Sequence, residues 1–152
     1  MLPLWIAAVF LALVTFYSGQ DLPRKEAVAA AVVADVSATN FLAYRSAARA
    51  YLAANPGASG VIDDAALAPY WLPGYNRNPL WTNLVQSEIL FVYATAATEK
   101  GTVHRLFELS KRSVLVGTKN ASTGRLMSGM GLDTGINLPA AIPDGAVVMI
   151  GS

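Results

Sequence analysis

The first 17 positions form an apolar run without a charged residue, and the rest of the chain has the mixed pattern of a folded domain. At about 1.5 Å per residue, a helix of this length spans roughly 25 Å, slightly less than the ~30 Å hydrocarbon core of a bilayer. Ser18 and Gly19 extend the run, and Trp5 and Tyr17 lie near its ends, as aromatic residues often do at membrane interfaces. The pattern predicts a membrane anchor over residues 1–19.

A cleaved signal peptide is the main alternative interpretation of this run. No Lys or Arg precedes the apolar residues, and cleavage after Gly19 would put the bulky Tyr17 where a small residue is required. A lipoprotein is excluded because the chain contains no Cys. These features favour an uncleaved anchor over a cleaved signal, and a soluble core helix is the least favoured interpretation.

A second helical pattern follows the anchor. The Asp21-Leu22-Pro23 stretch allows a new helix to begin, with Asp21 as its cap. From Arg24 to Asn55 there is no Pro or Gly and Ala is abundant, so we expect one helix of about 30 residues within the segment 20–56. Pro56 and Gly57 end it, because Pro cannot continue a helix and Gly accepts the reversed dihedral.

One face of this predicted helix is small in its first half and aromatic in its second. Spacings of three and four place the following residues on that face: Ala27, Ala30, Ala34, Ser37, Phe41, Tyr44, Ala48 and Tyr51. The opposite shoulder of the first half carries Val28, Val32 and Val36. We expect the aromatic half to pack on the domain. The small and valine-bearing half predicts a helix–helix interface with a second copy or another membrane protein; the alternative is ordinary intramolecular core.

Aromatic and proline residues dominate the segment 69–81, where three prolines preclude a regular element. Its aromatic residues, at irregular spacing, suit either cover for one edge of the core or a partner surface, and we favour cover: Tyr70, Trp71, Tyr75 and Trp81. Just before this segment, Asp63 and Asp64 precede a short helical turn that reaches Leu67. Capping of that turn is a better explanation of the two carboxylates than acid–base chemistry or a metal.

The remaining pattern predicts strands and one further helix. Trp81–Gln86 and Ile89–Thr95 resemble paired strands, and the second is apolar on both faces, which is typical of a central strand. A helix is expected over 98–112, with strands over 113–118 and 146–150. The sequence therefore predicts an α+β protein: an N-terminal transmembrane helix, a long second helix, and a domain over 57–152 with an antiparallel sheet of three to five strands and one further helix, in a pilin-like or permuted ferredoxin-like arrangement.

Composition removes several classes of function. A net charge of +1 leaves no basic footprint for nucleic acid, and the absence of Cys together with a single His removes the usual metal sites. That residue, His104, lies one position from the buried face of the predicted helix and has no evident catalytic partner. The Gly-rich segment 117–135 lacks a phosphate-loop pattern and is better explained as a structural connection between strands. We therefore expect no enzyme activity and no cofactor.

Several stretches occur in a recognisable order: FYSG at the end of the anchor, then FLAYRSAARAYLAANP, GVIDDAALAPYWLPGY, LWTNLVQSEILFVYA, RLFELSKRSVLVG and INLPAAIPDGAVVMI. This order resembles the small PilM family of type IV thin-pilus systems on conjugative plasmids. The resemblance implies a non-enzymatic, single-pass protein of the bacterial inner membrane, with a periplasmic domain that binds other pilus assembly proteins and possibly a second copy of itself. It carries no catalytic residue to this chain.

Two other interpretations remain open at this stage. The chain resembles a minor pilin in outline, but position 5 is Trp5, whereas the mature helix of a pilin has Glu there. An envelope enzyme would need a concave pocket with converging polar groups. Membrane orientation is also open, because Arg24 and Lys25 after the anchor slightly favour a cytoplasmic domain, whereas the resemblance favours the periplasm.

Overall fold

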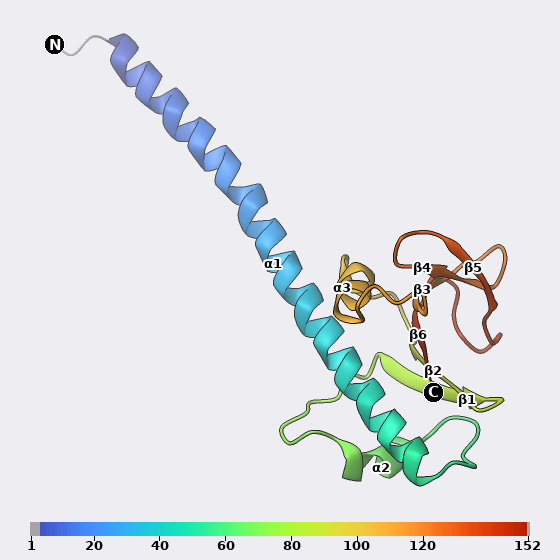
Figure 1. Cartoon of the computed structure of the whole chain (residues 1–152). Helices are drawn as coiled ribbons and strands as arrows, with labels where there is room; N and C mark the ends of the chain where they lie inside the picture. Colours follow the sequence, from blue (N-terminus) through green and yellow to red (C-terminus); the bar gives the residue numbers. More distant parts are fainter. Residues whose placement is uncertain (1–3, 152) are drawn as a thin grey trace.

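A computed structural model describes the backbone of residues 4–151 and the side chains of residues 5–15 and 25–151. Its dominant element is the helix α1, Leu4–Ala54, which at about 1.5 Å per residue is roughly 75 Å long. The N-terminal part of α1 extends far beyond the domain, and the C-terminal part lies against it (Figure 1). The anchor and the predicted second helix are thus one continuous element.

The break predicted at Asp21-Leu22-Pro23 does not occur, since the backbone remains helical through these residues. Pro23 has no N–H to donate to the carbonyl of Gly19, so the helix lacks one hydrogen bond there. The segments on both sides are apolar or Ala-rich and favour helix, so they continue across the proline. At its far end α1 stops where predicted, and the backbone N–H of Asn55 donates to the carbonyl of Tyr51 at 2.9 Å.

After α1 the chain forms two short helices and enters the sheet. The helix α2, Asp64–Leu67, is followed directly by the 3-10 helix η1, Ala68–Tyr70. The short turn before Leu67 is therefore confirmed. Asp63 occupies the cap position, but its side chain makes no capping hydrogen bond. Asp64 instead forms an ion pair with Arg77 at 2.8 Å, which ties α2 to the aromatic segment.

The sheet has six antiparallel strands in the order β1-β2-β6-β3-β4-β5. Their bounds are β1 Trp81–Gln86, β2 Ile89–Ala94, β3 Val116–Lys119, β4 Arg125–Ser128, β5 Asp133–Asn137 and β6 Val147–Gly151. The predicted pair of strands and the predicted closing strand are confirmed. The sheet exceeds the expected three to five strands because β4 and β5 lie inside the Gly-rich segment.

The strand β2 lies between β1 and β6 and is covered on both faces, as its apolar pattern predicts. Leu90 and Val92 belong to the core between the sheet and α1. Phe91 and Tyr93 face the other way, into a second core that contains the fully buried Ile142. Burial raises the pKa of the Tyr93 hydroxyl. Two layers therefore pack on the sheet, and α1 belongs to the first.

The helix α3, Thr102–Leu109, is shorter than the predicted range 98–112. It begins after Gly101, whose φ of 89° is left-handed, and Lys111 beyond its end is also left-handed, so a longer helix is prevented on both sides. Leu106 and Phe107 of this helix are buried. The helix lies beside α1 and against β3 (Figure 1).

Close packing explains why the segment 117–135 is rich in Gly. A Cβ atom at Gly117 would overlap the backbone of Met127 on the neighbouring strand, and one at Gly129 would lie 2.6 Å from the Cβ of Phe107. These glycines allow β3, β4 and α3 to approach each other. The segment consists of strands and turns, which agrees with its interpretation as a structural connection.

Candidate functional site

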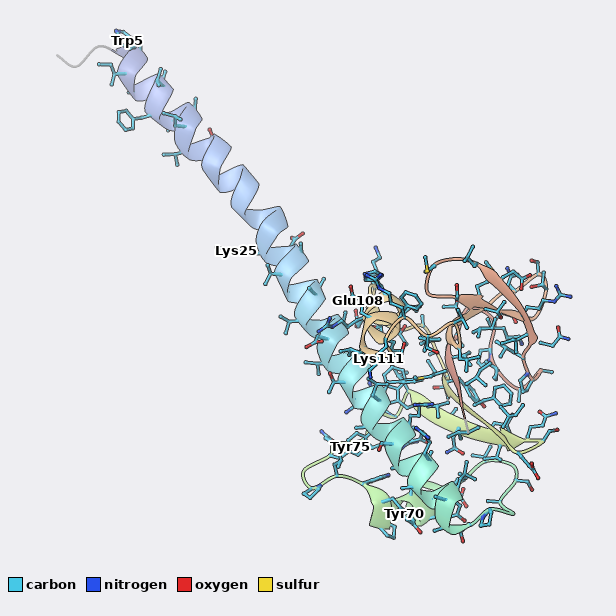
Figure 2. The ribbon with its side chains drawn as sticks, in the orientation of Figure 1. Trp5, Lys25, Tyr70, Tyr75, Glu108 and Lys111 are labelled. Atoms are coloured by element: carbon cyan, nitrogen blue, oxygen red, sulfur yellow. The ribbon has the colours of Figure 1, made fainter. Side chains whose placement is uncertain are left out.

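The exposed surface of α1 is the most unusual feature of the molecule. Its first described side chains, Trp5–Thr15, are almost all exposed although most are apolar: Phe10 is 66% exposed and Leu11 71%. Figure 2 shows Trp5 at the end of α1 farthest from the domain. Nothing in the described part of the chain covers this segment. Large exposed apolar patches commonly mark protein or membrane contacts, so this segment is a candidate contact surface.

The valine face of α1 is also uncovered. Val28 is 65% exposed, Val36 is 64% exposed, and Val32 between them is similarly open. At 100° per residue these positions lie on the side of the helix opposite Ala34, which faces α3. The described residues thus leave the predicted valine shoulder free for another molecule.

The small-residue face has a different environment from the one predicted. Ala27 and Ala30 are exposed, but Ala34 is buried, and its Cβ lies 3.5 Å from the position a Cβ would take at Gly101. Ala34 is therefore part of the contact between α1 and α3 within the domain, and its assignment to an intermolecular interface is corrected. The reason is that α3 begins with a glycine, which lets its backbone approach α1 closely.

An ion pair holds α3 against α1 near Asp35, where the domain first contacts the long helix. The Arg105 Nε donates to Asp35 at 2.6 Å, and its Nη1 donates to Glu108 at 3.1 Å. The hydrogen bond to Asp35, followed by that to Glu108, raises the pKa of Arg105. Beyond this junction, towards the N-terminus, none of the described side chains of α1 is buried.

The predicted aromatic set divides between core and cover. Trp81 is completely buried, packs edge-to-face on Phe41 at 5.0 Å, and donates its indole N–H to Asn40 Oδ1 at 2.9 Å. It is therefore removed from the predicted partner surface, because β1 begins at this residue and carries it into the core. Trp71 and Tyr75 are half-buried, pack edge-to-face with their ring centroids 5.6 Å apart, and contact the same core.

Tyr70 completes the cover at the C-terminal end of α1. It packs edge-to-face on Tyr51 at 5.8 Å, and Figure 2 shows Tyr70 and Tyr75 beside that half of the helix. Burial raises the pKa of Tyr75 to about 12, and its hydroxyl donates to Asn40 Oδ1 at 3.2 Å. The prediction that this segment covers one edge of the core is confirmed for these residues.

Groups that carry chemistry are dispersed over the described residues. His104 is largely exposed and lies 3.4 Å from Glu108, one helical turn away. Asp64 is paired with Arg77, and no group of three His, Asp or Glu within the described ranges could hold a metal ion. The apolar faces of α1 thus remain the candidate functional surface.

The comparison with known proteins agrees with this arrangement of a long helix on an antiparallel sheet. The family model for PilM matches residues 9–150. The chain belongs to the PilM family. A crystal structure of the protein PilM from Escherichia coli B7A matches with a TM-score of 0.58 at 27% sequence identity, over 78% of this chain and 90% of that chain. A search of curated proteins found no match.

Membership of the PilM family connects the chain with pilus biogenesis. It confirms the resemblance drawn from the sequence at the level of the family. The matched range contains most of α1 and the whole sheet, so the family includes both the exposed helix and the domain that holds its end. A function for a PilM-family protein must therefore account for the exposed apolar surface of α1.

Sequence reasoning missed the two asparagines that hold the C-terminal half of α1 in this PilM-family fold. Asn83 is fully buried; its Nδ2 donates to the Tyr44 hydroxyl at 2.8 Å, and its Oδ1 accepts from the Ile62 N–H at 2.8 Å. Asn40 accepts the hydrogen bonds from Trp81 and Tyr75. The available signal was an Asn in the middle of each apolar element, which indicates a buried hydrogen-bond network.

Proposed function

We propose that this PilM-family protein is a non-enzymatic, single-pass component of a pilus assembly apparatus in the bacterial inner membrane. The observation that carries the proposal is the exposed apolar N-terminal half of α1, which neither the sheet nor α3 covers. A bilayer would cover the first part of this half. A protein partner would cover the valine face that follows it.

The position of the membrane span follows from which part of α1 is free. Among the described residues, Lys25–Ala54 is long and apolar enough to cross a membrane, and Trp5–Thr15 is a shorter apolar stretch. The first of these, however, has Phe41 and Tyr44 buried in the domain core. We therefore assign the span to residues 1–19, whose described side chains, Trp5–Thr15, are almost all exposed and so free to contact lipid. The membrane should retain the intact chain and lose it when residues 1–19 are removed.

The valine face is the proposed contact with a partner helix, either of a second copy or of another membrane protein of the apparatus. Val28, Val32 and Val36 are β-branched and stiff, so they lose little side-chain entropy on packing. Ala27 and Ala30 are exposed too, but they lie on the opposite side of α1 and are not part of this face. Asp35, the one charged residue between Val28 and Val36, is paired with Arg105 of α3 at the edge of this face. The fit is thus to another apolar helix.

A cysteine cross-linking experiment tests this contact directly, because the chain has no Cys of its own. Val32→Cys should form a disulfide or a bismaleimide cross-link in membranes, and the size of the product tells a second copy from another protein. Ala31→Cys, on the side of α1 that lines a groove against α3, is the matched control and should react far less. Equal labelling of both positions, or none, would contradict the proposal.

The domain is proposed to lie in the periplasm, in line with what the family resemblance implies. An alkaline phosphatase fusion after Ser152 should be active and a green fluorescent protein fusion dark. The opposite result would place the domain in the cytoplasm, as Arg24 and Lys25 alone would favour. The proposed lack of enzyme activity is tested separately: turnover by the purified chain that is lost on changing Asp63, Asp64 or His104 would overturn it.

A minor pilin is the second candidate function. The observation in its favour is that α1 projects an apolar half and packs its other half on an antiparallel sheet, which is the outline of a pilin subunit. Against it stands Trp5, at a position where a pilin has Glu. Immunoblots of sheared, purified pili distinguish the two functions, because an assembly component stays in the membrane and a minor pilin appears in the fibre.

A further inference from the structure

A groove lies at the end of α1 farthest from the apolar N-terminal segment. Its volume is about 560 Å³. One wall is formed by the last turns of α1 and the turn that follows, and the other by the β1–β2 hairpin; the lining includes Arg49, Ala50, Leu52, Pro56, Val85 and Glu88. Leu52 and the buried Val85 belong to the first core, so the floor of the groove is apolar. Two hydrogen bonds of 2.8 Å between Gly60 and Val85 hold the turn to the strand.

The two walls carry opposite charges. Arg49 is exposed on the helix wall and Glu88 is exposed on the hairpin wall. Within the described ranges, neither side chain forms an ion pair with the other or with any other residue. The groove therefore presents one cation and one anion on either side of an apolar floor.

The backbone at Glu88 is left-handed, a conformation that non-glycine residues of the described chain otherwise adopt only at Ser87, Lys111 and Arg112. Ser87 and Glu88 have φ values of 52° and 63°, a left-handed conformation in which Gly is strongly preferred for a two-residue hairpin turn. Seven glycines occupy left-handed positions elsewhere in the described chain, so Gly is the usual solution in this sequence. Glu88 is therefore a position at which Gly would relieve backbone strain.

We propose that this groove binds a short peptide segment of a partner protein, with an apolar side chain on the floor, an acidic residue at Arg49 and a basic residue at Glu88. Charge complementarity defines this occupant. A small free ligand fits less well, because Arg49, Ala50 and Glu88 are all exposed and the open groove would leave much of such a ligand in water. The proposal goes beyond the proposed function and does not rest on membrane anchoring.

The test uses the full chain in detergent micelles and a phage-displayed library of random heptapeptides. Panning against the wild-type chain should enrich peptides that contain one acidic and one basic residue separated by apolar residues. Panning against Glu88→Lys should enrich peptides in which the basic residue is replaced by an acidic one. Synthetic peptides of the wild-type consensus should bind Glu88→Lys at least about tenfold more weakly. No enrichment, or the same consensus for both chains, would overturn the proposal.

Two further variants separate binding from folding. Ala50→Trp fills the groove from the exposed surface of α1 and should abolish peptide binding, whereas Ala29→Trp, equally exposed on the same helix but outside the groove, should leave it unchanged. Glu88→Gly relieves the left-handed strain, so it should raise the melting temperature and still weaken peptide binding. A Glu88→Gly chain that binds the consensus peptide as well as the wild type would contradict the assignment of Glu88.

Discussion

The two halves of α1 belong to one uninterrupted helix and share an Ala-rich composition between residues 27 and 54, yet their environments are opposite. From Ala34 onwards one face is buried, with Ala38, Phe41 and Tyr44 almost without solvent contact. Towards the N-terminus the apolar side chains are exposed, and those of Val28 and Phe10 have no cover within the described chain. The comparison shows that helical periodicity identifies which face of a helix is apolar. It does not identify the residue at which that face starts to be buried by the domain.

Side-chain volume accounts for the difference in burial between the part of α1 that begins at Ala34 and the stretch just before it. Burial of one aromatic side chain stabilises a fold by about 1.5–3 kcal/mol, whereas an Ala contributes much less. Phe41 and Tyr44 reach across to Trp81 and Asn83 of the first strand. Residues 25–33, just before the buried half, contain no aromatic side chain, so this stretch contributes little burial energy to the domain and remains available to a partner helix.

The largest effect is expected from removal of an aromatic anchor in the buried half. Phe41→Ala should lower the free energy of unfolding by about 3–5 kcal/mol, because it leaves a cavity against Trp81. Val32→Ala in the exposed half should change it by less than about 0.5 kcal/mol. Urea unfolding of the full chain in detergent micelles, followed by tryptophan fluorescence, measures both. Similar losses of unfolding free energy in the two variants would show that both halves contribute equally to the stability of the domain.

The next effect concerns the buried polar network beneath the same half. Asn83→Ala removes the acceptor for the Ile62 N–H and the donor to the Tyr44 hydroxyl, and buried groups left without a partner cost about 1–3 kcal/mol each. We expect a loss of about 2–3 kcal/mol in the free energy of unfolding. Amide hydrogen exchange should become faster at Ile62 and Tyr44 but not at Val32. Unchanged exchange at Ile62 would contradict the role assigned to Asn83.

Patterns in the sequence predicted the secondary structure well where the local signal was strong. The alternation in Ile89–Ala94 predicted a central strand covered on both faces, and the Pro56-Gly57 turn marked the end of α1. β4 and β5 were missed because Gly135 and its neighbours, which allow tight turns and bulges, hide the alternation of a strand. Pro23 was taken as a boundary because proline usually breaks a helix, and the continuous helix on both sides outweighed that tendency.

The candidate surfaces were predictable only in part, for a physical reason. Valines at spacings of four lie on one side of any helix, so the sequence could predict that Val28, Val32 and Val36 share a face. This face is exposed, as a contact surface requires. Ala34 and Trp81 were placed on contact surfaces but lie inside the domain, since their burial depends on α3 and β1, which are distant in the sequence. The Arg49–Glu88 groove is formed by residues far apart in the chain, so no local sequence pattern predicts it.

A smaller, pH-dependent effect should also appear only in the buried half. Burial raises the pKa of the Tyr44 hydroxyl, and it raises the pKa of Tyr75 to about 12. The unfolded chain then loses these protons near its usual tyrosine pKa of about 10, before the folded chain does. The contribution of these two hydroxyls to the free energy of unfolding is therefore constant below about pH 9 and is lost as the pH rises through 10 towards 12.

Tyr75→Phe provides the measurement for this pH dependence. The variant loses the hydrogen bond to Asn40 and should be less stable at pH 8, but its stability should decline less steeply between pH 10 and pH 12 than that of the wild type. Urea midpoints across this range give the slope. If the urea midpoint of the variant fell as steeply with pH as that of the wild type, Tyr75 would not have the raised pKa that its burial predicts.

The smallest effect on stability, with the greatest consequence for function, is expected from charges on the valine face. Val32→Glu together with Val36→Glu places two carboxylates on exposed positions of α1, so the free energy of unfolding should change by no more than about 0.5 kcal/mol. Pilus assembly and cross-linking through this face should be lost, because a partner helix would have to bury these charges. Ala38→Glu, only two residues further on, is the control: Ala38 is completely buried, and this variant should unfold the domain. If the double variant also unfolds the domain, the valine face is part of the core; if it assembles pili normally, the partner must bind elsewhere on α1.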